Sequence, residues 1–279
     1  YYSMFGFQRI HDLAWAAGDS RVKGFLLGAT SGRTTLNGEG LQHQDGHSHI
    51  LASTIPNCRS YDPCFSYELE SIIKNGIDDM YVHNNDRYYY ITLMNENYKH
   101  PKRPAEATDE NIMRGAYCFS RPKKIHFRIL ASGLTLNFAI EAQKILSSFN
   151  IGLEIWSITS FNELYKEGIE AERGERYFNN KERPHVLNIF KNPVPTIAVS
   201  EYQRAYANQL KQWATSDYIV LGTDGYGRSD TREKLRDFFE IDPNHIVLNV
   251  LKSLGKDAEY KKYVKENKIK LSKKAPWKR

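Results

Sequence analysis

The chain has 279 residues and 41% hydrophobic content, enough for one large or two medium-sized domains with proper cores. No run of about 18 or more apolar residues occurs, so the sequence predicts no membrane-spanning helix and no membrane partner. The formal net charge is +6, but residues 252–279 hold eleven Lys and Arg against three acidic residues. Such a basic tail is more often a solvated helix face than a nucleic-acid site, so we expect no nucleic-acid partner.

The cysteines and the first residues bear on the protein's setting. Three cysteines, an odd number without zinc spacing, favour a reduced, cytoplasmic compartment. The chain opens on the aromatic run YYSMF (residues 1–5), without an initiating Met or a signal peptide. We interpret it as the interior of a longer protein.

The first hundred residues predict the order helix, strand, loop, helix, strand. Apolar residues at helical spacing predict helices over 8–17 and 65–81, and short apolar or aromatic runs predict strands over 22–29, 51–55 and 88–93. A long, glycine-rich polar loop covers residues 31–49, and a loop of that length inside a compact domain is unusual unless it has a function. Residues 56–63 are turn-rich.

Residues 98–111 contain prolines and charges, and we place a domain boundary in this linker. Beyond it the pattern predicts strands over 125–131, 151–155, 195–199 and 218–221, and helices over 135–149, 201–213, 243–254 and 257–268. A short helix begins at Phe161, residues 166–192 look like a charged surface excursion, and Asp230 with Glu233 has the spacing of a capping box. Strands separated by helices predict an α/β fold with mostly parallel pairing.

The densest set of reactive side chains lies in residues 38–49, which contain His43, His47 and His49 with one Glu and one Asp. Imidazole and carboxylate groups can hold zinc or iron, but this spacing matches no strong metal signature. Histidine can also bind a carboxylate or move protons near neutral pH. The alternative is a hydrogen-bonded loop in which the imidazoles only tie down backbone groups.

Two other features could serve a ligand. The turn GTDGYGRSD (residues 222–230) joins a strand to a helix and could cradle a phosphate, but it lacks both the dinucleotide-binding glycine spacing and the P-loop lysine. Taken alone, it is more often a tight structural turn. The aromatic cluster Tyr1, Tyr2, Phe5 and Phe7 is, by composition alone, more often part of a core.

Several blocks, in order along nearly the whole chain, resemble homodimeric-type pyruvate dehydrogenases, the decarboxylating first component of the pyruvate dehydrogenase complex. The most specific block is GRTTLNGEGLQHQDGHSH (residues 32–49). Other matching blocks are YYSMFGFQRI (1–10), YYYIT (88–92), SITSF (157–161) and LGTDGYGRSD (221–230). The last thirty residues match only loosely.

The resemblance implies a transketolase-like α/β fold. Residues 1–100 would form the latter half of the pyrimidine-binding domain, and residues 101–279 the C-terminal three-layer α/β domain with its mostly parallel sheet. It also implies thiamine diphosphate and Mg²⁺ as cofactors, with the diphosphate and metal ligands in an upstream part that this chain does not include. The implied partners are pyruvate, the lipoyl domain of the dihydrolipoyl acetyltransferase component, and a second copy in a homodimer.

The resemblance also assigns roles to residues. Tyr2 and Phe5 fall where the pyrimidine ring is packed, and His43 falls at an active-centre histidine near pyruvate. Glu39 is a weaker supporting candidate, while His47 and His49 are expected only to order the loop. The cofactor supplies the electron sink for decarboxylation, and the protein orients the ring, binds the carboxylate and moves protons. The isolated chain is expected to be nearly inactive, and the alternative is a non-catalytic dimerisation or assembly fragment of that enzyme.

Overall fold

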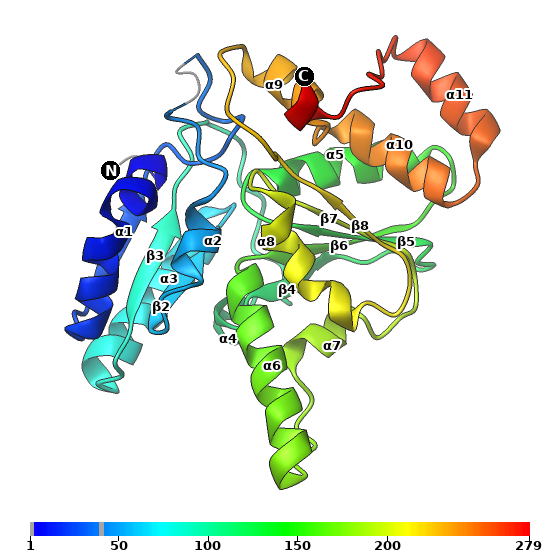
Figure 1. The fold of residues 1–279 in the computed structure, drawn as a ribbon. Coiled ribbons are helices and arrows are strands. Elements are labelled where there is room, and N and C mark those ends of the chain that lie inside the picture. The colour runs from blue at the N-terminus through cyan, green and yellow to red at the C-terminus, as the bar shows by residue number, and fades with distance from the viewer. Residues whose placement is uncertain (1–2, 39–41) are drawn as a thin grey trace.

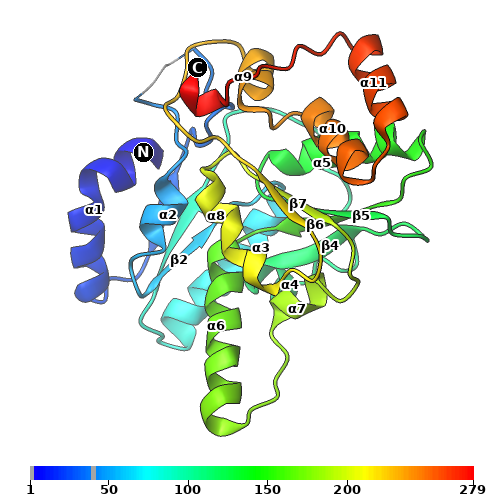
Figure 2. The same ribbon diagram turned by 45° about the vertical axis from the view of Figure 1, so that its right-hand side comes forward.

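The computed structural model describes residues 3–38 and 42–279, with side chains described from Phe7 onward. Two sheets lie side by side, each flanked by helices (Figure 1). Turning the molecule by 45° shows the helix α6 (Phe161–Phe178) projecting from its body (Figure 2). Among the residues described, no helix combines the length and the apolar character needed to cross a membrane.

The smaller sheet is parallel and has the strand order β1-β3-β2, with β1 at Phe25–Gly28, β2 at Cys58–Tyr61 and β3 at Tyr88–Thr92. The central strand β3 consists of aromatic and β-branched residues and is buried along its whole length, as expected for a strand covered on both faces. The helices of this part are α1 (Ser3–Asp19), α2 (Ser48–Ala52) and α3 (Ser66–Ile77), the last continued by the π-helix η1 (Asp78–Val82).

The larger sheet has the order β4-β6-β5-β7-β8, and only its edge strand β4 runs antiparallel. Its strands are β4 (Ala116–Ser120), β5 (Phe127–Ala131), β6 (Leu153–Ile158), β7 (Thr196–Val199) and β8 (Tyr218–Leu221). The intervening and following helices are α4 (Asp109–Met113), α5 (Thr135–Ser147), α6, α7 (His185–Ile189), α8 (Arg204–Asn208), η2 (Gln209–Trp213), α9 (Arg232–Phe239), α10 (Pro243–Ser253), α11 (Asp257–Glu266) and η3 (Pro276–Lys278).

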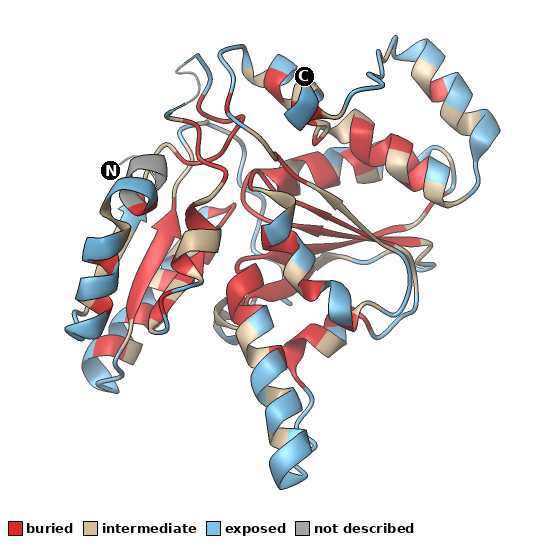
Figure 3. Cartoon of the chain, viewed as in Figure 1, coloured by how far each residue is buried: buried red, intermediate tan, exposed pale blue. Residues whose placement is uncertain are grey.

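Alternate side chains of the larger sheet enter two different cores. On β5, Phe127 and Ile129 join the core beneath α5 and α10, while Leu130 joins the core beneath α6 and α7. The first of these cores also takes in residues of β2 and β3, so the two sheets share one apolar interior. Figure 3 shows this buried interior against the exposed tip of α6.

Several sequence-based boundaries were wrong for physical reasons. Residues 51–55, expected as a strand, contain the end of helix α2 and the turn that follows it, and the turn-rich segment contains strand β2. Helix α6 runs for 18 residues instead of one or two turns, because its tip is charged and exposed and so lacks a continuous apolar stripe. The N-cap of α9 is Thr231, whose side chain accepts from the Lys234 amide, and not Asp230.

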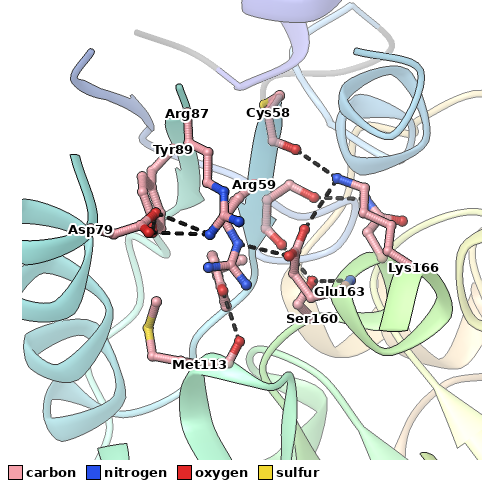
Figure 4. A network of polar contacts seen from close by, with 12 residues as sticks. Cys58, Arg59, Asp79, Arg87, Tyr89, Met113, Ser160, Glu163 and Lys166 are labelled. Atoms are coloured by element: carbon pink, nitrogen blue, oxygen red, sulfur yellow. Dashed lines mark hydrogen bonds and ion pairs between the residues drawn. The ribbon is translucent and has the colours of Figure 1, made fainter. Parts of the chain in front are cut away.

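A network of ion pairs joins the two parts where β2 faces α6 (Figure 4). Arg59 on β2 donates its Nε–H to Glu163 Oε2 at 2.7 Å, and Lys166 Nζ lies 3.2 Å from Glu163 Oε1. Arg87 pairs with Asp79 at 3.1 Å beside them. These groups border a cavity of about 420 Å³ in which bases and acids are matched, so we interpret it as a structural joint between the two parts of the chain.

Candidate functional site

The histidine-rich segment, residues 31–49, begins directly beyond the carboxyl end of β1. Ser31 donates its backbone N–H to Leu93 O at 3.0 Å, which ties the start of the segment to the end of β3. Gly32 follows with φ +90°, and a side chain there would overlap the Glu201 carboxylate. The sequence therefore needs glycine at this position both for the backbone conformation and for the close approach of Glu201.

His43 is half-buried, with its Nδ1 atom inside the protein. The residue before it, Gln42, accepts a hydrogen bond from Arg9 Nη2 at 3.3 Å. Arg9 lies on α1, and Figures 1 and 2 both show the N-terminal turns of α1 beside the histidine-rich segment. The residue next to His43 therefore lies beside α1, the helix on which Phe5 was predicted to contact the cofactor.

Tyr2 and Phe5 are the residues predicted to contact the cofactor. Tyr2 and Glu39 fall outside the described residues, and so does the side chain of Phe5, whose backbone belongs to α1. Phe7, the fourth member of the aromatic cluster, is buried against Tyr90 with ring centroids 4.5 Å apart. Phe7 thus belongs to the core, as the composition of the aromatic cluster alone would indicate.

His47 is held between two side chains. Arg33 Nη2 lies 3.1 Å from His47 Nδ1, and the side-chain amide of Gln203 lies 2.8 Å from His47 Nε2. Burial, and then the neighbouring Arg33 charge, lower the pKa of His47 below its ordinary value. A neutral imidazole with both nitrogens engaged is suited to fixing the loop, which supports the expectation that His47 orders the segment.

His49 is fully buried and serves the interior. Its Nε2 lies 3.0 Å from Thr92 Oγ1, and its ring stacks on Tyr206 at a centroid distance of 4.9 Å. Burial lowers the pKa of His49 to about 3, so the imidazole is neutral at physiological pH. Thr92 in turn donates to Asp62 Oδ1 at 2.7 Å. His49 is therefore part of a buried polar chain and not of an open site.

The glycine-rich turn, residues 222–230, packs directly on the histidine-rich segment. Arg33 Nη1 donates to Gly225 O at 2.7 Å, and Gln44 brackets Arg228 by accepting from its N–H and donating to its C=O, each at 2.7 Å. A Cβ on Gly227 would lie 2.6 Å from Gln44 Oε1. The backbone of this turn is thus used by the protein itself, which favours the structural interpretation over phosphate binding.

In the described part of the histidine-rich segment, side chains able to bind a metal ion do not form a cluster. Within residues 3–38 and 42–279, one grouping of potential ligand atoms occurs, formed by Asp237, Asp242 and His245 at the α9–α10 junction. Asp242 caps α10 and lies 2.8 Å from His245 Nδ1. Burial alone would lower the pKa of His245, but the hydrogen bond and charge of Asp242 raise it overall, and a protonated imidazole is a poor metal ligand.

Comparisons with known proteins identify the family that this chain resembles. The family model of the pyruvate dehydrogenase E1 component middle domain matches residues 1–101, and that of the transketolase-like C-terminal domain matches residues 115–242. The pyruvate dehydrogenase E1 component of Pseudomonas aeruginosa is 52% identical over 264 residues, which cover 91% of this chain and 30% of that protein. The Escherichia coli K12 protein of the same name is 47% identical over 271 residues, 95% of this chain and 30% of its own length.

This chain is a homologue of part of the pyruvate dehydrogenase E1 component. It spans about 30% of the length of these curated relatives. Its fold is transketolase-like. The transketolase structure from Campylobacter jejuni superposes with a TM-score of 0.70 at 18% identity, over 90% of this chain and 35% of its own. A transketolase structure from Pichia stipitis superposes with a TM-score of 0.72 at 15% identity, over 91% of this chain and 33% of its own. The predicted α/β class and transketolase-like fold are thereby confirmed.

Sequence reasoning missed the contribution of the larger sheet to the E1-like histidine segment. Glu201 and the turn at residues 222–230 contact Gly32, Thr34, Thr35 and Gln44 across more than 160 positions of sequence. The one local signal was the set of three glycines in the turn. Two of them, Gly222 and Gly227, leave room for Arg204 and Gln44 respectively.

Proposed function

We propose that this chain forms part of the active centre of a thiamine-diphosphate-dependent pyruvate dehydrogenase, which decarboxylates pyruvate and passes the acetyl group to a lipoyl group of its acetyltransferase partner. The whole protein would act as a cytoplasmic homodimer. The observation that carries the proposal is the E1-like segment 32–49, in which the residue next to His43 lies beside α1. The names of the relatives support the substrate, since they are pyruvate dehydrogenase E1 components.

We propose that residues of this chain form part of the cofactor site. Tyr2 and Phe5 are proposed to pack against the aminopyrimidine ring, because flat, stiff aromatic side chains orient a planar ring at low entropic cost. When bound, the cofactor supplies the electron sink that permits carbon dioxide to leave. Following the resemblance, we propose that the diphosphate and the Mg²⁺ are held by residues outside this chain.

His43 is proposed to act on the substrate itself. With Nδ1 inside the protein, the half-buried ring can present its other edge to pyruvate. From there it can donate a hydrogen bond to the carboxylate or the keto oxygen, and it can hold or move a proton at Nε2. His47 and His49, whose rings are engaged by Gln203 and Thr92, hold the segment in shape. We also propose the domain boundary near residue 100, between the two sheets.

The decisive experiment uses the full-length enzyme with thiamine diphosphate and Mg²⁺. Carbon dioxide release from pyruvate and acetylation of an isolated lipoyl domain are measured for wild type, His43→Ala and His83→Ala. His83 is exposed at the end of η1 and serves as a matched control. We expect His43→Ala to lower kcat/KM by roughly 10²–10⁴-fold, in the range of a lost general acid–base group, and His83→Ala to leave it unchanged. Wild-type rates in His43→Ala, or no turnover of pyruvate by wild type, would contradict the proposal.

A second candidate function, an assembly fragment without catalysis, has one observation in its favour. Leu13, Trp15 and Leu27 on α1 and β1 are exposed by 65, 45 and 39%, and exposed apolar side chains are available for further protein contacts. Both functions predict little decarboxylation by the 279-residue chain alone, so they are distinguished in the full-length enzyme. A loss of activity in His43→Ala that His83→Ala does not show favours the catalytic function, and appreciable turnover by the isolated chain would also exclude a purely architectural role.

A further inference from the structure

We propose that Glu201, on the larger sheet, is a positioning residue that holds the His43 segment in its working shape. The larger sheet would then be a functional part of the active centre and not only a scaffold. This inference rests on the function proposed above. Glu201 follows the carboxyl end of β7 and is 1% exposed, although it carries a carboxylate.

Both carboxylate oxygens of Glu201 are used by the segment. Oε1 accepts from the backbone N–H of Thr34 at 3.2 Å and from the Thr34 hydroxyl, and Oε2 accepts from the Thr35 hydroxyl at 2.7 Å. Gly32 makes this approach possible, because any side chain there would occupy the position of the carboxylate. Three donors on two successive residues fix the start of the segment to one point of the larger sheet.

A second attachment lies on the other side of His43. Gln44 donates to Leu36 O and to Arg228 O, both at 2.7 Å, and the Gln203 backbone N–H donates to Gly46 O at 2.9 Å. Along the sequence, His43 lies between these two attachments and directly precedes Gln44. A shift at the Glu201 attachment would move Leu36, whose carbonyl accepts from Gln44, the neighbour of His43.

The surroundings of Glu201 indicate that its carboxylate serves a role other than stability. Burial raises its pKa, while Arg236 and the hydroxyls of Thr34 and Thr35 favour the ionised form. Arg236 lies within 3.4 Å of Thr34 Oγ1 and pairs with Glu96, so it stabilises the same attachment from the second side. Burying a carboxylate is costly, and apolar residues would pack the same space at lower cost if only stability were needed.

Glu68 provides a matched control. It is also fully buried, and it accepts from Tyr117 OH at 2.6 Å and Ser157 Oγ at 2.7 Å while capping α3. None of its partners belongs to the His43 segment. Glu68→Gln and Glu201→Gln thus make the same chemical change in equally buried sites, and only the second reaches the proposed active centre.

The test uses the full-length enzyme and two independent readouts. Hydrogen–deuterium exchange of peptides covering residues 31–49 is measured without cofactor, and kcat/KM for pyruvate is measured with thiamine diphosphate and Mg²⁺. We expect Glu201→Gln to speed exchange in that segment and to lower kcat/KM by roughly 10- to 100-fold, the range for a displaced catalytic group. Glu68→Gln is expected to lower the melting temperature while leaving segment exchange and kcat/KM near wild type.

Thr35→Val covers the case in which Glu201→Gln does not fold. It removes a single donor and keeps the carboxylate, so it should change both readouts in the same direction and by less. Exchange and kcat/KM in Glu201→Gln or Thr35→Val equal to those of Glu68→Gln would overturn the positioning role. If wild type does not turn over pyruvate, the proposed function fails, while the exchange measurement still decides whether Glu201 holds the segment.

Discussion

The two sheets of this chain are stabilised in different ways. The larger sheet has five strands with a core on each face, and its central strand β5 is buried along its whole length. The smaller sheet has three strands, and its edge strand β1 is only partly buried, with Leu27 39% exposed. One face of the smaller sheet shares the core of its larger neighbour, while the other rests on a small cluster beneath α1 and α2.

This difference between the two sheets bears on how the proposed site is supported. The histidine-rich segment leaves the less protected sheet, yet its hydrogen bonds go largely to the larger one, through Glu201 and the turn at residues 222–230. A catalytic segment needs a rigid support, and here the support comes from the part with the greater burial. The smaller sheet would then contribute residues to the site, and the larger sheet would hold them in position.

The largest expected effect comes from truncating one leucine in each sheet. Leu130→Ala on β5 removes a fully buried side chain between packed helices and should lower the free energy of unfolding by about 2–5 kcal/mol. Leu27→Ala on β1 should lower it by less than about 1 kcal/mol, because that side chain is already partly hydrated. Urea unfolding followed by circular dichroism measures both, and equal losses would show that the two sheets do not differ as described.

The second prediction tests whether the smaller sheet depends on the larger one through the ion-pair joint. Glu163→Gln removes the charge that Arg59 contacts at 2.7 Å, in a pair whose side chains are 21 and 9% exposed. We expect a loss of about 1.5–3 kcal/mol, typical of a hydrogen bond to a charged group, with faster amide exchange in β2. Lys262→Gln, in an exposed pair with Glu266, should change stability by less than about 0.5 kcal/mol. Unchanged exchange in β2 would argue that the joint is not needed by the smaller sheet.

How far the sequence predicted this structure depends on the kind of signal. The aromatic strand at 88–92 and the helices with clear apolar faces were predicted because their patterns are local. Strand β2 was missed because CRSY contains the polar residues Arg59 and Ser60, whose side chains bond to Glu163 and Asn162 on the distant helix α6. The end of helix α2 was taken for the start of a strand because a segment as short as LASTI, residues 51–55, shows no periodicity that separates the two.

The candidate site divides in the same way. His43 could be selected from its sequence block, and the bond between Arg9 and Gln42 supports its place beside α1. Glu201 could not be selected, since nothing in the residues around it indicates that its carboxylate meets Thr34 and Thr35. Contacts between segments so far apart along the chain leave no periodicity, and a single sequence carries no other record of them.

The third prediction concerns the pH dependence of stability at the buried contact between the two sheets. Asp62, at the end of β2, accepts from Ser132 Oγ at 2.8 Å and from Thr92 Oγ1, which also contacts His49. Burial raises the pKa of Asp62 to about 7, so the folded protein binds a proton there that the unfolded chain releases near pH 4. By linkage, this group makes stability fall as pH rises from about 4 to 7.

His49 acts in the opposite sense, because burial lowers its pKa to about 3 and the unfolded chain takes up its proton below about pH 6.5. Its contribution makes stability rise between about pH 3 and 6.5, so the two buried groups largely offset each other. Asp62→Asn removes one of them, and the variant should gain stability relative to wild type as pH rises from 4 to 6.5. Urea midpoints measured across that range check the sign: parallel curves for the two proteins would mean that Asp62 ionises normally, and that the contact between the sheets is open to water.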